Sequence, residues 1–154
     1  MTIRAVIFDL GGVLIEIDWT RYREEKQLSG QENDLYPYDY EQLNTDLARF
    51  VSDLRPRYKT ATICNRGSRE AVNRKFRLGE LVDLMIFDGE EGVAKPDARI
   101  YQLALMRLGV QPHEVVFVDD KERNVEAAQR LGMHTVHFKS TAQAIAEVQT
   151  ILRR

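Results

Sequence analysis

Short apolar runs rich in Val and Ile alternate with amphipathic segments along most of this 154-residue chain. Turn residues bound each run, which is typical of parallel strands joined by crossover helices. The runs that we interpret as strands are residues 5–8, 60–63, 84–87, 115–118 and 135–138. This alternation predicts an α/β fold, a Rossmann-like three-layer sandwich with a central, mainly parallel sheet.

The segments between the strands carry the periodicity of helices that cover a sheet. Residues 41–54 and 142–152 each place their apolar side chains on one face. Gly109 and Gly132 each follow a helical run and suit the left-handed residue that ends a helix. Residues 19–40 are rich in charge and carry no such stripe, so we predict a short helix and a loop there.

The bulk composition favours one globular domain over residues 1–154 and a small-molecule partner. With 44% hydrophobic and 30% charged residues, a chain of this length can bury one core. Its formal net charge of -2 argues against nucleic acid and against an anionic membrane as the main partner. The lone Cys64 cannot form an internal disulfide, no signal-peptide pattern is visible, and no apolar stretch approaches the roughly 20 residues that span a bilayer. We therefore expect a cytoplasmic protein, and the sequence leaves a homodimer open.

Polar residues gather where the predicted strands end, which is where open parallel sheets bind their ligands. Asp9 comes directly after the first strand, and the glycines behind it let the backbone approach a ligand closely. The other residues of this kind are Cys64 and Asn65 after the second strand, Lys95 before a predicted helix, and Asp119, Asp120 and Asn124 after the fourth. Adjacent carboxylates suit a hard cation. Each residue alone also fits a cap, a turn or a solvated charge, but together they indicate one site for a metal ion and an anion.

Three segments are similar to signatures of the haloacid dehalogenase-like superfamily, namely residues 8–14 (FDLGGVL), 92–101 (GVAKPDARIY) and 116–132 (VFVDDKERNVEAAQRLG). They stand in the family's order, and the resemblance spans residues 6–138 apart from the insert 19–40. It implies a magnesium-dependent, phosphatase-type fold in which the insert is an abbreviated helical cap.

The resemblance implies that Asp9 is the nucleophile, which would attack phosphorus and form an aspartyl-phosphate. Lys95 would neutralise the crowded carboxylates and the transferring phosphoryl group. Cys64 and Asn65 stand where family members hold the phosphate oxygens. Phosphoryl transfer needs mainly positioning and charge neutralisation, so this set of residues suits the reaction.

The resemblance also implies a Mg²⁺ site. The ion would bind the Asp9 carboxylate, the backbone carbonyl of Gly11 and the Asp120 carboxylate. Asp119 would bind it directly or through water, and Asn124 would orient this acidic loop.

Two positions depart from the family pattern. Most phosphatases of the superfamily carry a second Asp two residues after the nucleophile as general acid and base, and here that position is Gly11. Such assistance is typically worth about 10²- to 10⁴-fold in rate. Glu16 or Asp18 on the following flap could supply the proton, although a solvated hairpin charge is the simpler explanation for both. Cys64 replaces the usual Ser or Thr, and a thiol is the poorer hydrogen-bond partner for phosphate.

Several functions remain open at this point. A subset of sugar-phosphate phosphatases in the superfamily shares Asp-Leu-Gly here, so we favour a magnesium-dependent phosphatase of a small phosphorylated metabolite such as a sugar phosphate. Gly11, Cys64 and the short insert also fit a degenerate member that binds a ligand or a protein without turnover. A haloacid dehalogenase lacks the same Asp, but its halide contacts usually come from a larger cap that we cannot match. A bacterial receiver domain would place the acid pair first and the lysine last, the reverse of the order here.

Overall fold

The computed structural model describes residues 2–29 and 37–154, so residues 30–36 of the expected insert lie outside the described residues. The strands are β1 (Ala5–Phe8), β2 (Ile15–Ile17), β3 (Glu41–Leu43), β4 (Lys59–Cys64), β5 (Leu84–Phe87), β6 (Val115–Asp119) and β7 (His134–His137). The α-helices are α1 (Trp19–Ser29), α2 (Thr45–Leu54), α3 (Arg69–Phe76), α4 (Leu78–Leu81), α5 (Asp88–Glu91), α6 (Ala98–Leu108), α7 (Glu122–Arg130) and α8 (Thr141–Leu152). Two 3-10 helices, η1 (Pro37–Tyr40) and η2 (Pro112–Glu114), complete the described elements.

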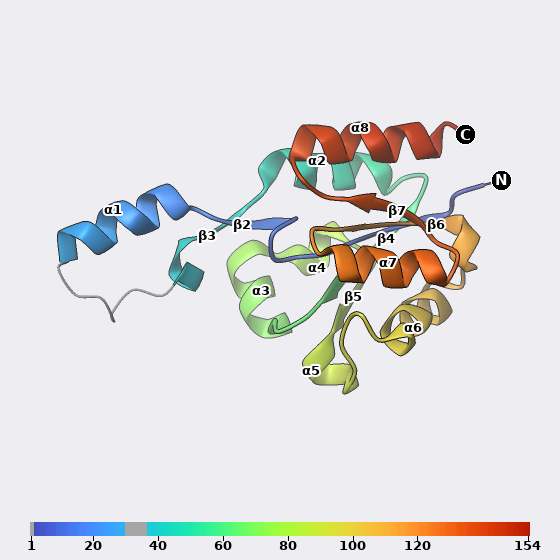
Figure 1. The fold of residues 1–154 in the computed structure, drawn as a ribbon, viewed down its shortest axis with the longest axis horizontal. Coiled ribbons are helices and arrows are strands. Elements are labelled where there is room, and N and C mark those ends of the chain that lie inside the picture. The colour runs from blue at the N-terminus through green and yellow to red at the C-terminus, as the bar shows by residue number, and fades with distance from the viewer. Residues whose placement is uncertain (1, 30–36) are drawn as a thin grey trace.

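Five strands form one parallel sheet in the order β5-β4-β1-β6-β7, with β1 at its centre. Helices α2 and α8 lie on one face of this sheet, and α6 and α7 lie on the other (Figure 1). The predicted α/β sandwich with a central parallel sheet is therefore confirmed.

The residues of β1 alternate between two apolar clusters. Val6 and Phe8 pack in the cluster that includes α2 and α8, while Ala5 and Ile7 pack in the cluster that includes α6. Side chains of a strand point alternately to the two faces of its sheet. Because helices cover both faces here, all four residues are fully buried. Burying an Ile or a Val completely contributes about 1.5–3 kcal/mol relative to leaving it exposed, so β1 anchors both helical layers.

The helix predicted for residues 41–54 begins later than expected. Residues Glu41–Leu43 form β3, which pairs antiparallel with β2. Asn44 then caps α2, since its side chain accepts a hydrogen bond from the amide of Leu47 at 3.2 Å. The prediction was wrong for the first residues because an apolar Leu43 fits a strand as well as a helical stripe, and pairing with β2 decides between them.

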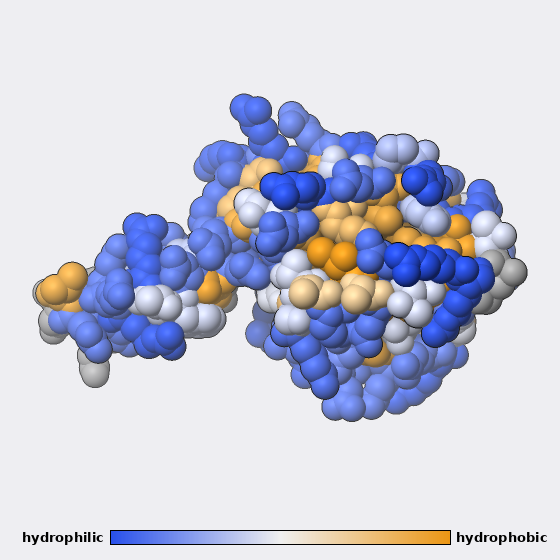
Figure 2. Space-filling model, turned by 90° about the horizontal axis from the view of Figure 1, so that it is seen from above, coloured by the Kyte–Doolittle hydropathy of each residue, from blue (hydrophilic) through white to orange (hydrophobic). Residues whose placement is uncertain are grey.

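A projecting arm, residues 18–40, leaves the core through the β2–β3 ribbon (Figure 1). Its described parts bind one another: the amide of Asp18 donates to the carbonyl of Tyr40 at 2.9 Å, and the Tyr40 hydroxyl donates to Glu25 at 2.5 Å. Figure 2 shows the arm as a separate and mostly hydrophilic projection. Trp19 and Leu28 are nevertheless 48% and 87% exposed. No helix in the described part of the chain is long and apolar enough to cross a membrane.

Candidate active site

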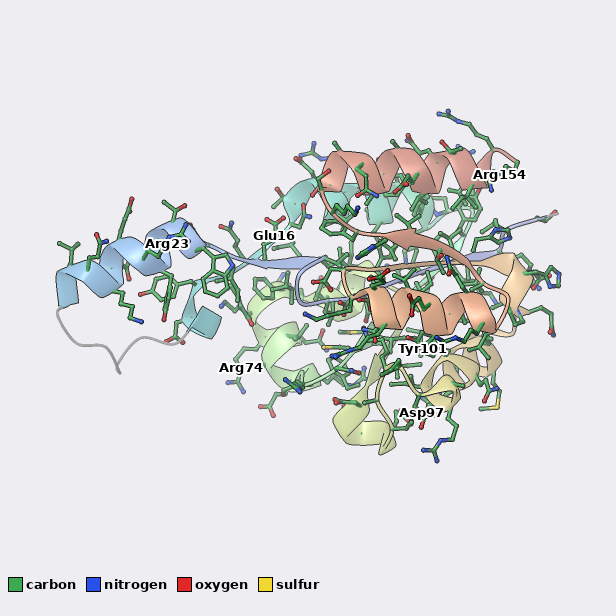
Figure 3. All side chains as sticks on the ribbon, in the orientation of Figure 1. Glu16, Arg23, Arg74, Asp97, Tyr101 and Arg154 are labelled. Atoms are coloured by element: carbon green, nitrogen blue, oxygen red, sulfur yellow. The ribbon has the colours of Figure 1, made fainter. Side chains whose placement is uncertain are left out.

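The topology gathers the predicted site residues at the carboxyl end of the sheet. Asp9 follows β1, Asn65 follows β4, and Asp119 ends β6, and β4 and β6 are the two neighbours of β1. The arm leaves from this same end, where Figure 3 labels Glu16 on β2. Residues far apart in the sequence therefore meet because parallel strands end side by side.

Lys95 joins two of the carboxylates. Its Nζ atom donates to Oδ1 of Asp9 at 2.8 Å and to Oδ2 of Asp119 at 2.9 Å. All three residues are buried: Lys95 is 4% exposed, Asp9 is 7% exposed and Asp119 is 0% exposed. Asn124 donates its side-chain amide to the same Asp119 oxygen at 3.2 Å, and the Lys121 amide donates to the other at 2.8 Å. Asp119 is thus held by three separate donors.

The electrostatics of this cluster depend on burial. Burial raises the pKa of Asp9 to about 7, the charge of Asp119 adds to the rise, and the ammonium group of Lys95 opposes it. Burial works against the charge of Lys95, but the carboxylates of Asp9 and Asp119 outweigh it and raise the pKa of the lysine. Lys95 is therefore cationic at neutral pH, and Asp9 gains its charge near neutral pH in the metal-free protein.

Three carboxylates form a group that could hold a metal ion. Ligand atoms of Asp9, Asp119 and Asp120 all lie within 4.8 Å of one another. Oδ1 of Asp120 is buried and has no hydrogen-bond partner among the described residues, whereas buried polar atoms are normally satisfied. Oxygen ligands with unused lone pairs are what Mg²⁺ and Ca²⁺ bind, so the donor set fits a hard divalent cation.

Two adjacent glycines shape the backbone beside these carboxylates. Gly12 has φ +85°, and a Cβ there would lie 2.4 Å from Oδ2 of Asp120, so only glycine fits. At Gly11 a Cβ would meet no heavy atom within 4 Å. Gly11, which the resemblance places as a carbonyl ligand, therefore leaves room for a side chain.

Asn65 and Cys64, which are predicted to contact phosphate, have different surroundings in the structure. Both ends of the Asn65 amide pair with the backbone of Lys95: Oδ1 accepts from its N–H at 3.0 Å and Nδ2 donates to its carbonyl at 2.9 Å. Asn65 thereby fixes the loop that carries the lysine. Cys64 is buried, and burial together with the charge of Asp9 raises the pKa of its thiol to about 12. Cys64 therefore stays a neutral thiol at neutral pH.

The two alternative acids lie outside the cavity next to Asp9. Oδ1 of Asp18 accepts a hydrogen bond from the Arg21 amide at 3.0 Å in the first turn of α1. Glu16 stands opposite Gln42 in the β2–β3 ribbon (Figure 3). Neither lines the cavity, so the structure brings no second acid next to Asp9 from this segment.

A cavity of about 530 Å³ opens beside the cluster. It is lined by Asp9, Gly11, Asn65, Lys95 and Asn124 of the predicted set, and in addition by Arg66, Asp88, Ala94, Pro96, Lys121 and Arg123. The sequence offers Arg66 within the basic segment 66–77, which could meet an anionic substrate or simply form a solvated helix face, and it did not point to Lys121 or Arg123. Arg66 directly follows Asn65 and Lys121 directly follows Asp120, so adjacency to the motif residues was the available signal.

The family model of the haloacid dehalogenase-like hydrolases matches residues 24–132 of this chain. That is well over half of the sequence, and the five-stranded sheet and the Asp9–Lys95–Asp119 cluster agree with the resemblance of its motifs. The chain belongs to the haloacid dehalogenase-like (HAD) hydrolase family.

Curated relatives are similar over different parts of their length. A mouse protein, acyl-CoA dehydrogenase family member 10, is 40% identical over 46% of this chain, which covers only 6% of that protein. The phosphorylated carbohydrates phosphatase of Thermotoga maritima is 35% identical over 62% of this chain and 47% of its own length. The sesquiterpene phosphatase astK of Aspergillus oryzae is 26% identical over 98% of this chain and 97% of its own length. The chain thus spans a small part of some relatives and nearly all of another.

Solved structures show the same fold at low identity. A predicted HAD-like family hydrolase from Porphyromonas gingivalis superposes with a TM-score of 0.77 and 21% identity, over 100% of both chains. An aspartate-to-alanine variant of a HAD family enzyme from Bacteroides thetaiotaomicron, in complex with magnesium and inorganic phosphate, gives a TM-score of 0.71 at 20% identity. That match covers 90% of this chain and 95% of the other.

Proposed function

We propose that this chain is a magnesium-dependent phosphatase that hydrolyses a small phosphorylated metabolite, such as a sugar phosphate, through an aspartyl-phosphate on Asp9. The observation that carries the proposal is the buried Asp9–Lys95–Asp119 cluster at the carboxyl end of the sheet. It opens into a cavity of about 530 Å³, a size suited to a small ligand. Two relatives named as phosphatases, one of phosphorylated carbohydrates, support this substrate class.

Asp9 and Lys95 divide the chemistry between them. A carboxylate oxygen of Asp9 forms a bond to phosphorus as the bond between phosphorus and the ester oxygen breaks, and the departing oxygen takes a proton. Water then attacks the aspartyl-phosphate, which releases inorganic phosphate and restores the carboxylate. Lys95, held 2.8 Å from Oδ1 of Asp9, neutralises charge on the transferred group in both steps.

The carboxylates of Asp9, Asp119 and Asp120 and the carbonyl of Gly11 would hold the magnesium ion. The buried Oδ1 of Asp120, which has no partner among the described residues, supports this assignment. A bound magnesium ion supplies neutralisation of the phosphoryl oxygens. In the metal-free protein the pKa of Asp9 is raised to about 7 by burial, so a cation beside it also favours the charged nucleophile.

The glycine at position 11 leads us to expect a slow reaction. No carboxylate stands two residues after Asp9, and neither Glu16 nor Asp18 lines the cavity. The departing oxygen therefore takes its proton from water, and turnover is slow for poor leaving groups. The same feature supports the rival proposal, a protein that binds a phosphorylated ligand without hydrolysing it.

Steady-state phosphate release tests the proposal. An aryl phosphate and a panel of sugar phosphates are incubated with and without Mg²⁺, using the native chain, Asp9→Asn and the matched control Asp53→Asn, an exposed carboxylate on α2. We expect magnesium-dependent release that Asp9→Asn abolishes and Asp53→Asn leaves unchanged. Magnesium or phosphate-analogue binding without turnover of any ester would favour the rival, and release of halide from haloacids would indicate a dehalogenase.

A further inference from the structure

We infer that the substrate carries a second anionic group, which Arg66, Lys121 and Arg123 recognise at the edge of the candidate active site. This inference rests on the proposed phosphatase function and narrows its substrate class to bisphosphates and phosphorylated carboxylic acids. The three cations line the same cavity as Asp9 and Lys95. We call them the rim cations.

The rim cations reach the cavity from two sides of β1. Arg66 follows β4, while Lys121 and Arg123 stand at the start of α7, just after β6. Since β4 and β6 flank β1, the rim cations approach from both neighbours of the nucleophile strand. A ligand with its phosphoryl group at Asp9 would present its far end to this rim.

The charged groups of the rim cations have no protein partner among the described residues. By contrast, two arginines that follow Arg66 in the sequence are paired: Arg69 with Glu90 at 3.0 Å, and Arg74 with Glu70. The backbone amides of Arg66 and Lys121 donate to carboxylates, but no ion pair or hydrogen bond joins the charged group of a rim cation to any residue in the described part of the chain. All three side chains are exposed. Their charge is therefore available to a ligand.

A larger cavity shows the contrast. It measures about 710 Å³ and opens at the amino ends of the strands, where arginines also gather. There Arg55 pairs with Asp83 at 3.0 Å and Arg107 pairs with Glu91 at 2.6 Å, so much of the positive charge is already neutralised. Unneutralised cations lining a concave site strengthen the local field and attract anions.

One phosphoryl group does not account for the rim cations. Lys95 already contacts Asp9 and Asp119, and it lies where the transferred group would bind. The rim adds three positive charges, against which the same lining sets only the further carboxylate of Asp88. That carboxylate accepts from the backbone amide of Arg66 at 3.0 Å, so it holds the Arg66 backbone in place.

Arg66 also adopts an uncommon backbone conformation. Its φ is 61°, in the left-handed region that Gly and Asn occupy at lower cost than residues with longer side chains. Strained conformations of this kind gather at ligand sites. The left-handed residue here carries a charged side chain into the cavity lining, which favours a role for that charge.

Calorimetric binding in the presence of Mg²⁺ tests the inference without requiring turnover. The Asp9→Asn chain is titrated with two pairs of probes: fructose monophosphate against fructose bisphosphate, and glucose phosphate against phosphogluconate. The first pair differs by a phosphoryl group and the second by a carboxylate, so the two pairs distinguish the sources of the second charge. We expect the doubly anionic member of at least one pair to bind about tenfold more tightly, as several weak charge contacts would give.

Single variants assign the preference to the rim. Arg66→Asn, Lys121→Gln and Arg123→Gln should each lower the affinity ratio about two- to fivefold, the range for exposed charge pairs. The matched control is Arg77→Asn, because Arg77 also has a left-handed φ, of 52°, yet lies outside the cavity lining. It should leave the ratio unchanged.

The outcomes separate this inference from the proposed function. Equal affinity within both pairs, no measurable binding of any probe, or a ratio that all three rim variants leave intact would overturn the inference. A wild-type chain that hydrolyses the two members of each pair with equal efficiency would support the phosphatase function and would contradict the rim preference. If the chain binds the probes as expected but hydrolyses none of them, the rim inference holds and the proposed phosphatase function is wrong.

Discussion

The Nζ atom of Lys95 lies 2.8 Å from Oδ1 of Asp9, and both side chains are almost fully excluded from solvent. The same nitrogen contacts Asp119, whose side chain is 0% exposed. One buried cation thus holds two buried carboxylates from separate strands in the metal-free protein. The cluster therefore already contains the lysine that neutralises charge in the proposed reaction. Because all three groups are buried together, replacing any one of them should lower stability or activity.

Lys95→Met is expected to destabilise the metal-free protein by about 3–5 kcal/mol, because it leaves two buried carboxylates without their cation. Urea unfolding in the presence of a chelator measures the change, and Mg²⁺ should recover part of the loss. The matched control Lys139→Met, at an exposed position, should stay within about 0.5 kcal/mol of wild type. A loss below about 1 kcal/mol for Lys95→Met, within the range of an exposed pair, would contradict this view of the cluster.

The raised pKa of Asp9 predicts a pH-dependent stability difference. Burial raises this pKa from 3.8 to about 7, so the folded state favours the neutral carboxyl group. The stability that protonated Asp9 contributes to the folded protein is complete below the unfolded pKa of 3.8, and it is lost as the pH rises through about 7. Without magnesium, Asp9→Asn should therefore gain stability relative to wild type between pH 4 and pH 8, by up to about 4 kcal/mol. Chemical unfolding at several pH values gives this difference, and a flat or falling curve would argue against a raised pKa.

The open space at Gly11 predicts that a general acid can be added. Gly11→Asp should fold normally, because a Cβ at this position meets no heavy atom within 4 Å. It should raise turnover of alkyl phosphates about tenfold or more, within the range for general acid-base assistance. Gly12→Ala is the contrasting variant, since its Cβ would lie 2.4 Å from Oδ2 of Asp120, and it should lose activity. If Gly11→Asp gives no gain while Mg²⁺ still binds, the missing acid does not limit the reaction.

Cys64 should be unreactive in the folded protein. Burial and the charge of Asp9 raise the pKa of its thiol to about 12, so at pH 8 the thiolate fraction is on the order of one in ten thousand. Alkylation by iodoacetamide at pH 8 should be slow in native buffer and fast in guanidinium chloride, where the thiol is exposed. Similar rates in the two conditions would show that the thiol is not held as the structure describes.

The arm should be dispensable for folding of the core. Ile17 and Glu41 pair directly in the β2–β3 ribbon, so a two-residue Asn-Gly turn can join them in place of residues 18–40. We expect the melting temperature to change by no more than about 2 °C, as for a surface change of about 0.5 kcal/mol. Thermal unfolding followed by circular dichroism measures the shift. A drop of about 10 °C or more would mean that the arm helps to hold the core together.

The sequence predicts which segments form the strands of the sheet better than it predicts the ends of those strands or their order. The predicted bounds of β1 and β5 agree with the structure because turn residues flank both apolar runs. By contrast, β7 begins at His134, one residue before the expected start, since its bounds follow pairing with β6. The strand order β5-β4-β1-β6-β7 has no local signal, because it depends on how the crossover helices pack on the sheet.

The site divides in a similar way. Motif spacing pointed to Asp9, Lys95 and Asp119, and the structure brings these three together. Pairing of the Asn65 amide with the backbone of Lys95 joins residues 30 positions apart, so no local pattern could show it. Lys and Arg together number 22, and only the fold shows which of them line the cavity and lack a protein partner.

Trapping the covalent intermediate would show directly whether Asp9 is the nucleophile. The chain is mixed with an aryl phosphate and Mg²⁺, quenched in acid, reduced with borohydride at the acyl phosphate, and mapped by peptide mass spectrometry. We expect a reduced aspartate at position 9 in the native chain and none in Asp9→Asn. With no acid at Gly11 to activate water, the intermediate should persist long enough to detect. Phosphate release that leaves Asp9 unmodified, or that marks another residue, would contradict the role of Asp9 as nucleophile.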